Sequence, residues 1–183
     1  MGGVGADGGV VCPVGGGVEA GRIDARLAEL GIILPDVAAP VAAYVPAVRS
    51  GNYVYTSGQL PFIDGVLPCT GKVSDGQGER DDVAFHEVSL EVAADCARTA
   101  ALNALAAVKA LVGSLDLVVR IVKVTGFVAS VPTFTGQPAV INGASTVLGE
   151  IFGEAGVHSR SAVGVAVLPL DSPVEVELIV EVV

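Results

Sequence analysis

The chain ends in a stretch, VEVELIVEVV at 174–183, that alternates apolar and acidic side chains. Successive side chains of a β-strand point to opposite faces of its sheet. One face of this segment therefore carries Val174, Val176, Leu178 and Val180, and the opposite face carries Glu175, Glu177 and Glu181. This period of two predicts a half-buried strand.

The segment before it, SAVGVAVLP at 161–169, predicts a second strand, joined to the last one by a tight turn at 170–173. One of its faces is headed by Arg160 and then carries only small residues, Ala162 and Gly164, which leaves room for a ligand or for another backbone. The other face is branched and is expected in the core. A cation at such a position is costly to bury unless an anion meets it, so Arg160 either reaches into water or binds an anion. Glu175 is expected close by, just beyond the turn.

Alanine and leucine recur at helical spacing over 85–112, and Gly113 follows. Further helices are predicted over 18–31 and 139–153, the latter starting near Asn142. Strands are predicted over 115–130 and on both sides of a turn at 50–52, and 64–78 is predicted to be a loop or irregular hairpin. Two helices among paired strands predict an α+β fold, with the helices covering one face of a mixed sheet. We divide the chain into a flexible glycine-rich tail (1–17), a helix with its connector (18–40) and one domain (41–183).

Composition restricts the environment and the partners. Hydrophobic residues make up 51% of the 183 residues and the mean hydropathy is +0.66, yet no uncharged apolar run reaches the roughly 20 residues that a membrane span needs. The surplus apolar surface favours a homo-oligomer. The net charge of −10 and the scattered basic residues disfavour nucleic-acid binding. Three cysteines without paired spacing indicate reduced thiols and a cytoplasmic location.

Other reactive side chains lack the partner residues that a metal site or a catalytic motif requires. His86 and His158 have no cysteine or carboxylate at metal-ligand spacing, so a zinc site is not expected. Ser57 lies in TSGQ, which differs from the nucleophile elbow of serine hydrolases. Tyr44, taken alone, is an ordinary tyrosine at the edge of a strand.

Three motifs together resemble the reactive intermediate deaminase (Rid) family, also called YjgF-type or L-PSP endoribonuclease-like proteins. They are AVRSGNYVYTSGQLP at 47–61, Asn142 in the second helix, and SRSAVGVAVLPLDSPVEVELIVEV at 159–182. The resemblance implies a chorismate-mutase-like fold, assembled as a homotrimer with active sites between subunits. It also implies the hydrolysis of enamines and imines, such as 2-aminoacrylate and 2-iminobutyrate, to 2-keto acids and ammonia without a cofactor.

The resemblance assigns roles to individual residues. Arg160 would bind the carboxylate of a small metabolite, Glu175 would orient the attacking water, and Tyr44 would assist proton transfer. The remaining substrate-binding residues would be Ser57, Asn142 and Ala162. The chain departs from the family in AAYVP around Tyr44 and in Ala162, where a cysteine is common and where the backbone amide could still serve. Two alternatives stay open, a non-catalytic trimer that binds a carboxylate metabolite and an endoribonuclease or translation inhibitor.

Overall fold

A computed structural model describes residues 21–37, 43–76 and 86–183. The flexible tail predicted at 1–17 lies outside these residues, as does Phe85. In chain order the elements are α1 (Arg22–Glu29), β1 (Ala47–Ser50), β2 (Tyr53–Thr56), β3 (Lys72–Val73), β4 (Glu87–Val88), α2 (Leu90–Val112), β5 (Val118–Ala129), α3 (Gln137–Phe152), β6 (Ser159–Val165) and β7 (Val174–Val182). The short pair β3 and β4 forms a parallel ladder of its own.

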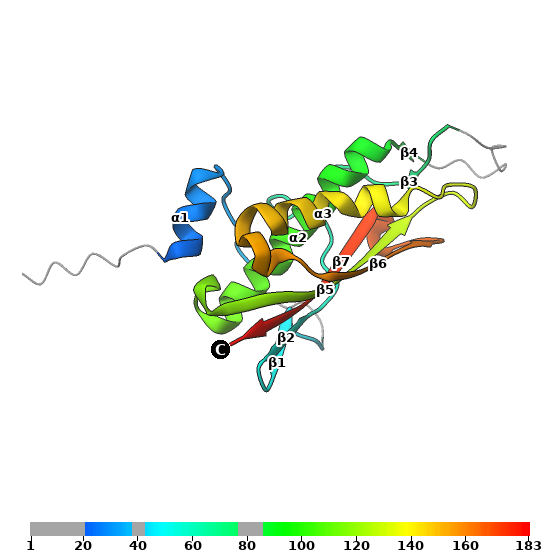
Figure 1. The fold of residues 1–183 in the computed structure, drawn as a ribbon. Coiled ribbons are helices and arrows are strands. Elements are labelled where there is room, and N and C mark those ends of the chain that lie inside the picture. The colour runs from blue at the N-terminus through cyan, green and yellow to red at the C-terminus, as the bar shows by residue number, and fades with distance from the viewer. Residues whose placement is uncertain (1–20, 38–42, 77–85) are drawn as a thin grey trace, which may run out of the picture.

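The main sheet has the strand order β1-β2-β7-β5-β6. Its neighbours are antiparallel except β5 and β6, which are parallel and are connected through α3. A parallel pair needs such a crossover, because a tight hairpin can join only antiparallel strands. Helices α2 and α3 lie on one face of this mixed sheet (Figure 1). The predicted α+β class, with two helices on one face, is therefore confirmed.

The position of β5 contradicts one prediction from the sequence. We expected 161–169 and 174–183 to be neighbours across a tight turn, but β5 lies between β6 and β7. The chain passes from β6 to β7 through a short 3-10 helix at Pro169–Asp171. Adjacent position in the sequence favoured a hairpin, whereas the long β5 offers both of its edges, one to each strand.

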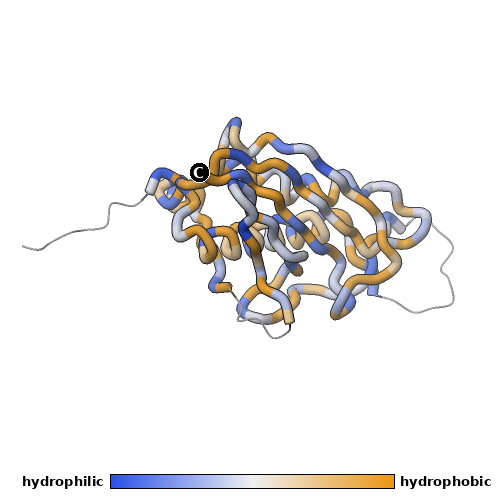
Figure 2. Tube along the Cα trace, turned by 90° about the horizontal axis from the view of Figure 1, so that it is seen from below, coloured by the Kyte–Doolittle hydropathy of each residue, from blue (hydrophilic) through white to orange (hydrophobic). Residues whose placement is uncertain are grey.

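The strand β7 shows the predicted alternation. Its apolar residues Val174, Val176, Leu178, Val180 and Val182 are all buried, and Glu175, Glu177 and Glu181 are partly exposed on the opposite face. We call the sheet face away from α2 and α3 the open face. It carries half-exposed apolar side chains, namely Val48, Tyr53, Tyr55 and Val163. Figure 2, seen from below Figure 1, shows hydrophobic and hydrophilic residues alternating along the strands.

The two long helices begin elsewhere than predicted. Helix α2 starts at Leu90 and not at 85, because Ser89 accepts a hydrogen bond from the Val92 N–H and so caps the first turn. It ends at Val112, and the following Gly113 has a φ of +89°, which suits glycine. Helix α3 starts at Gln137, with Pro138 in its first turn, where the missing proline N–H costs nothing. Asn142 therefore lies inside α3 and not at its start.

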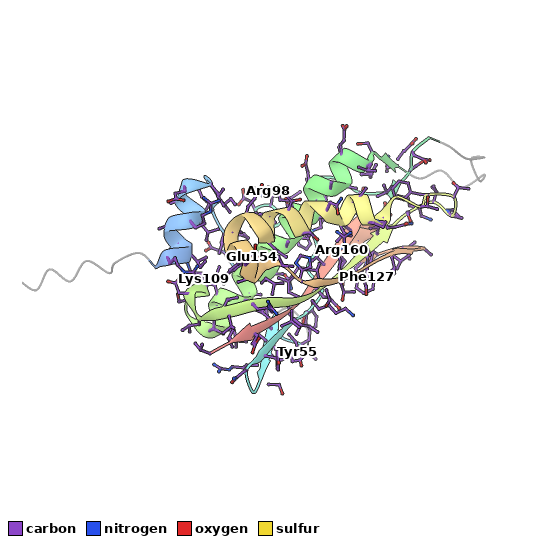
Figure 3. The ribbon with its side chains drawn as sticks, in the orientation of Figure 1. Tyr55, Arg98, Lys109, Phe127, Glu154 and Arg160 are labelled. Carbon is purple, nitrogen blue, oxygen red and sulfur yellow. The ribbon has the colours of Figure 1, made fainter. Side chains whose placement is uncertain are left out.

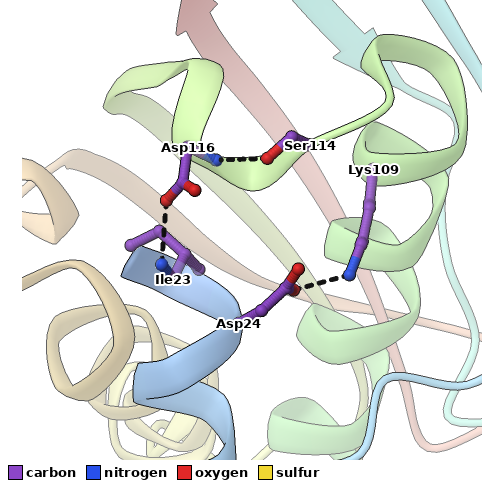
Figure 4. Close-up of polar contacts among 5 residues, drawn as sticks. All are labelled: Ile23, Asp24, Lys109, Ser114 and Asp116. Atoms are coloured by element: carbon purple, nitrogen blue, oxygen red, sulfur yellow. Dashed lines mark hydrogen bonds and ion pairs between the residues drawn. The ribbon is translucent and has the colours of Figure 1, made fainter. Parts of the chain in front are cut away.

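Helix α1 is attached to the domain by polar contacts (Figure 4). The Ile23 N–H donates to Asp116 Oδ1 at 2.8 Å, which satisfies one of the free donors of the first turn. Lys109 Nζ forms a 2.6 Å ion pair with Asp24. Ile23 and Leu27 are buried in the same hydrophobic core as α2 and α3. Within the described part of 18–31, the predicted helix is confirmed, and Gly31 follows it with a φ of +65°.

Candidate functional site

Arg160 lies near the start of β6 and its guanidinium turns toward α3 (Figure 3). Its Nη1 donates to Asn142 Oδ1 at 2.8 Å and to Ser145 Oγ at 3.1 Å. The side chain is otherwise exposed, and no acidic side chain lies within ion-pair distance of it among the described residues. Two contacts on one nitrogen hold the guanidinium plane and leave the N–H groups of Nε and Nη2 for an anion.

His158 extends this contact by one step. Its Nδ1 lies 2.6 Å from the Gly156 carbonyl oxygen, and its Nε2 lies 3.0 Å from Ser145 Oγ. A carbonyl can only accept, so Nδ1 carries the proton, and in the neutral ring Nε2 accepts from the Ser145 hydroxyl. The Ser145 oxygen then presents a lone pair to Arg160. We call Asn142, Ser145, His158 and Arg160 the arginine cluster.

The sequence interpretation missed Ser145 and did not connect His158 with Arg160. A signal for Ser145 was present, because Asn142 and Ser145 are three residues apart and so share one face of a helix. Nothing in the sequence placed that face against the start of β6. The pairing of β6 with β5 creates this contact, since α3 connects these two strands.

The small residues of β6 face the helices. Ala162 pairs with Gly126 of β5, and a Cβ on Gly126 would lie 2.4 Å from the Ile141 side chain of α3. The sequence left open whether a ligand or another backbone lies against this face. In the structure helix α3 fills much of that space. The expectation that Ser161, Val163 and Val165 face the core is wrong, since Val163 is 44% exposed on the open face.

Glu175 lies on the open face, where β7 passes the irregular end of β2. Its carboxylate lies against Gly58, and any Cβ at Gly58 would overlap it. Gln59 and Val176 exchange backbone hydrogen bonds of 2.9 and 3.0 Å and hold this arrangement. Burial, and after it the neighbouring Glu177 carboxylate, raise the pKa of Glu175 above the ordinary value of 4.5. Such a carboxyl group takes up a proton more readily than a fully solvated one.

Ser57 precedes Gly58, which contacts Glu175, and it forms hydrogen bonds to the two residues that follow Tyr44. The Ser57 hydroxyl donates to the Val45 carbonyl at 2.7 Å, and the Ser57 N–H donates to the Pro46 carbonyl at 2.8 Å. These two bonds fix the segment that directly follows Tyr44. The Tyr44 side chain itself is 62% exposed. We call Tyr44, Ser57, Gly58 and Glu175 the glutamate cluster.

The two clusters project from opposite faces of the sheet within one chain. Arg160 pairs with Val124, which pairs with the buried Leu178 on the helix side. Glu175 pairs with Phe127, which pairs with Val163 on the open face. Directly paired residues share a face, so a single chain does not bring Arg160 and Glu175 together. The prediction that a tight turn makes them neighbours is wrong, because β5 separates their strands.

The described surface carries two hollows, one of which reaches the arginine cluster at Asn142. One of about 310 Å³ runs between α2 and α3, and its lining includes Arg98, Asn142 and Glu150. A wider one of about 730 Å³ lies at the start of α2 around Ser74 and Glu87, away from both clusters. The described residues contain no group of three or more histidine, cysteine or acidic side chains suited to a metal ion. None of the helices in that part of the chain is both long and apolar enough to cross a membrane.

Comparison with known proteins gives the family. The family model described as YjgF/chorismate-mutase-like, putative endoribonuclease, matches residues 24–182. Protein TCP17 of Trypanosoma cruzi is 42% identical over 171 residues, which cover 90% of this chain and 96% of TCP17.

Two solved structures extend this likeness to the fold. A putative endoribonuclease from Shewanella oneidensis is 33% identical with a TM-score of 0.77, over 87% of this chain and 99% of that one. Escherichia coli TdcF, crystallised with bound serine, is 27% identical with a TM-score of 0.54, over 81% of this chain and 93% of that one. The chain belongs to the YjgF/chorismate-mutase-like family, as its motifs and its fold both indicate.

Proposed function

We propose that this protein hydrolyses small enamine or imine carboxylates, of the 2-aminoacrylate or 2-iminobutyrate type, to 2-keto acids and ammonia. The observation that carries the proposal is the double hydrogen bond that α3 makes to Arg160 Nη1, at 2.8 and 3.1 Å. The Nε and Nη2 edge of the guanidinium is left in a fork that matches the two oxygens of a carboxylate. Serine, which TdcF binds in its crystal structure, is likewise a small carboxylate.

A complete site would need a second copy of the chain. The arginine cluster and the glutamate cluster lie on opposite faces of one sheet, so Glu175 reaches a substrate held by Arg160 only if another subunit supplies it. Half-exposed apolar side chains such as Tyr53, Tyr55 and Val163 on the open face give that contact a surface to bury. We propose a homotrimer, in which each of three interfaces joins the Arg160 edge of one subunit to the open face of the next.

The chemistry would proceed in three steps. An enamine first tautomerises to its imine, while Arg160 holds the carboxylate and so fixes the reacting carbon. A water molecule oriented by Glu175 adds to that carbon, a C–O bond forms, and the C=N electrons pass to nitrogen, which takes a proton. The resulting carbinolamine then releases ammonia as the C=O bond forms. One water is consumed for each keto acid and ammonia produced.

The remaining residues would assist these steps. Glu175 accepts a proton from the water and returns one to the leaving nitrogen, a task that its raised pKa suits. The Tyr44 hydroxyl would assist the same transfer, and Ser57 would hold the Tyr44 segment in place. The Ala162 backbone would contact the substrate beside Arg160. Water is the only co-reactant in this scheme, so it calls for neither a metal nor a cofactor.

The test measures keto-acid release from 2-iminobutyrate that an amino-acid oxidase generates in the same cuvette. We expect the wild-type protein to accelerate the release and Arg160→Ala to lose at least about 100-fold, because the variant loses both charge and orientation. Thr146→Ala, an exposed change on the same helix as Asn142, should keep full activity. A wild-type protein that leaves the uncatalysed rate unchanged would overturn the proposal.

A trimer that binds a small carboxylate without turning it over is the second candidate. Ala162 favours it, because this position often holds a cysteine in the deaminases that the chain resembles. Titration calorimetry with 2-ketobutyrate separates the two candidates. Saturable binding that Arg160→Ala abolishes, in a protein without deaminase activity, would favour the binding protein.

A further inference from the structure

Two thiols from distant parts of the chain contact each other. Cys69 Sγ lies 3.5 Å from Cys96 Sγ, although 27 residues separate them in sequence. Cys69 lies in the segment between β2 and β3, and Cys96 lies in the second turn of α2. Both are free thiols, Cys69 partly exposed and Cys96 only 2% exposed. Neither residue belongs to the arginine or the glutamate cluster, and the function proposed above makes no use of them.

The surroundings make closer approach of the two sulfurs feasible. Cys96 is fixed within the regular helix α2, whereas Cys69 follows Val66 and Pro68 in an exposed irregular segment. A disulfide requires the sulfurs to come to about 2.05 Å. Rotation of the two side chains and a small shift of the loop can supply that movement, because no sheet ladder holds Cys69.

We propose that Cys69 and Cys96 form a reversible disulfide when the protein meets a hydroperoxide. Cys69 thiolate attacks the terminal hydroxyl oxygen of the hydroperoxide and the O–O bond breaks, so that Cys69 becomes a sulfenic acid. The leaving group is the alkoxide, which is hydroxide when the oxidant is hydrogen peroxide. The Cys96 sulfur then attacks the Cys69 sulfur. The S–O bond breaks, and the departing hydroxide leaves as water with the Cys96 proton. Two thiols have supplied two electrons to one peroxide.

The two cysteines have different roles in this sequence. Burial, and after it the contact with Cys69, raise the pKa of Cys96 to about 12, so this thiol stays protonated at neutral pH. It also lies out of reach of a dissolved oxidant. Cys69, the more exposed of the two, is therefore oxidised first, and Cys96 resolves the sulfenic acid. The thiolate is the reactive form of cysteine, so a Cys96 thiol that stays protonated does not react first with the peroxide.

The disulfide would tie the segment from Ser57 to Gly71 onto α2. Asn103 of α2 already donates through Nδ2 to the Leu60 and Phe62 carbonyls, at 2.8 and 3.1 Å. At its far end the Gly71 N–H donates to the Asp171 carbonyl at 2.8 Å. The disulfide would lie between these two contacts, and it would also restrict the conformations open to the unfolded chain, which stabilises the folded state. We expect oxidation to raise the melting temperature by roughly 5 °C or more.

The experiment uses the full chain carrying Cys12→Ser, which removes the third cysteine. The protein is treated with hydrogen peroxide, unfolded, and alkylated with N-ethylmaleimide with and without dithiothreitol. Intact mass should show no alkylation after oxidation and two alkylated thiols after reduction. Peptide mapping should recover one cross-linked pair that contains Cys69 and Cys96.

Controls separate this disulfide from other oxidation products. Cys69→Ser and Cys96→Ser, each in the Cys12→Ser background, should show neither the cross-linked peptide nor the rise in melting temperature. The mass and peptide-mapping results on the Cys12→Ser protein stand even if one of these variants fails to fold. Two thiols that stay alkylatable, a cross-link only between chains, or Cys69 converted to sulfinic acid without a cross-link would each overturn the proposal.

Discussion

Arg160 and Glu175 point away from opposite faces of the same sheet, because β5 lies between their strands and sets the register of both. If the two residues serve one reaction, they must come from different copies of the chain. A subunit that has Arg160 but lacks Glu175 can then share a complete site with a subunit that has Glu175 but lacks Arg160, when both are present in one assembly.

In the proposed homotrimer, mixing two inactive variants should restore activity. Arg160→Ala and Glu175→Gln are unfolded together in equal amounts, refolded, and assayed for keto-acid release. With random mixing, about a quarter of the interfaces join an intact Arg160 edge to an intact Glu175 face, so we expect about a quarter of wild-type activity. Each variant refolded alone should stay inactive. No recovery in mixtures whose subunit exchange is proven by mass spectrometry would contradict a shared site.

Removing Asn142 should weaken substrate binding more than turnover. Asn142→Ala deletes one of the two acceptors that hold Arg160 Nη1, and a hydrogen bond to a charged group contributes about 1.5 kcal/mol or more when it is intact. We expect KM to rise about tenfold and kcat to change less than about threefold. Thr146→Ala, one turn along α3, is the matched control and should change neither constant. An equal loss in kcat with KM unchanged would assign Asn142 a different role.

The raised pKa of Glu175 gives a pH-dependent stability. The folded protein binds this proton more tightly than the unfolded chain, so the contribution to stability is full below the ordinary pKa of 4.5 and is lost as pH rises through the folded-state pKa. A glutamine at position 175 has no proton to lose in this pH range, so its contribution to stability does not fall as the pH rises. The Arg160→Ala background removes the guanidinium that the proposed interface would bring to residue 175, and in this background Glu175→Gln should therefore stabilise the protein at pH 7. The gain should stay below about 1 kcal/mol, because the carboxylate is partly exposed.

Thermal unfolding at a series of pH values measures this effect. The advantage of Glu175→Gln should shrink toward zero as the pH falls below about 4.5, where the carboxyl group is protonated in both states. With Arg160 present and an interface as proposed, the advantage at pH 7 should be smaller or reversed, since the guanidinium then favours the charged carboxylate. An advantage that is the same at all pH values would show that packing and not charge causes it.

Local patterns in the sequence predicted the elements better than their arrangement. The alternation of β7 and the alanine spacing of α2 are properties of neighbouring residues, and both predictions are confirmed. The start of α2 was misplaced although Ser89 was available as a cap, because the helical spacing continued upstream into β4. The insertion of β5 between β6 and β7 depends on pairing across the whole fold, and no local pattern encodes it.

The same division holds for the candidate site. The strand pattern indicated Arg160 as a candidate to bind an anion and Glu175 as a carboxylate near it, and the family resemblance added Asn142 and the roles of all three. The structure adds Ser145 and His158, which reach Arg160 only because α3 packs over the start of β6. It also separates Glu175 from Arg160, a result that depends on the strand order. The residue types thus predicted the chemistry of the site, but they could not predict whether one chain brings all of its residues together.

The contact between α2 and α3 predicts opposite effects for two similar substitutions. A Cβ on Gly143 would overlap the Ala94 backbone carbonyl of α2, and a backbone atom can move away only if the whole helix shifts. Gly143→Ala should therefore destabilise the protein by about 1–3 kcal/mol. Gly149 lies on the same helix with nothing within 4 Å of its added Cβ, so Gly149→Ala should stabilise by about 0.5–1 kcal/mol through helix propensity alone. Urea unfolding of both variants measures the difference, and a Gly143→Ala protein as stable as Gly149→Ala would show that the two helices are not in close contact.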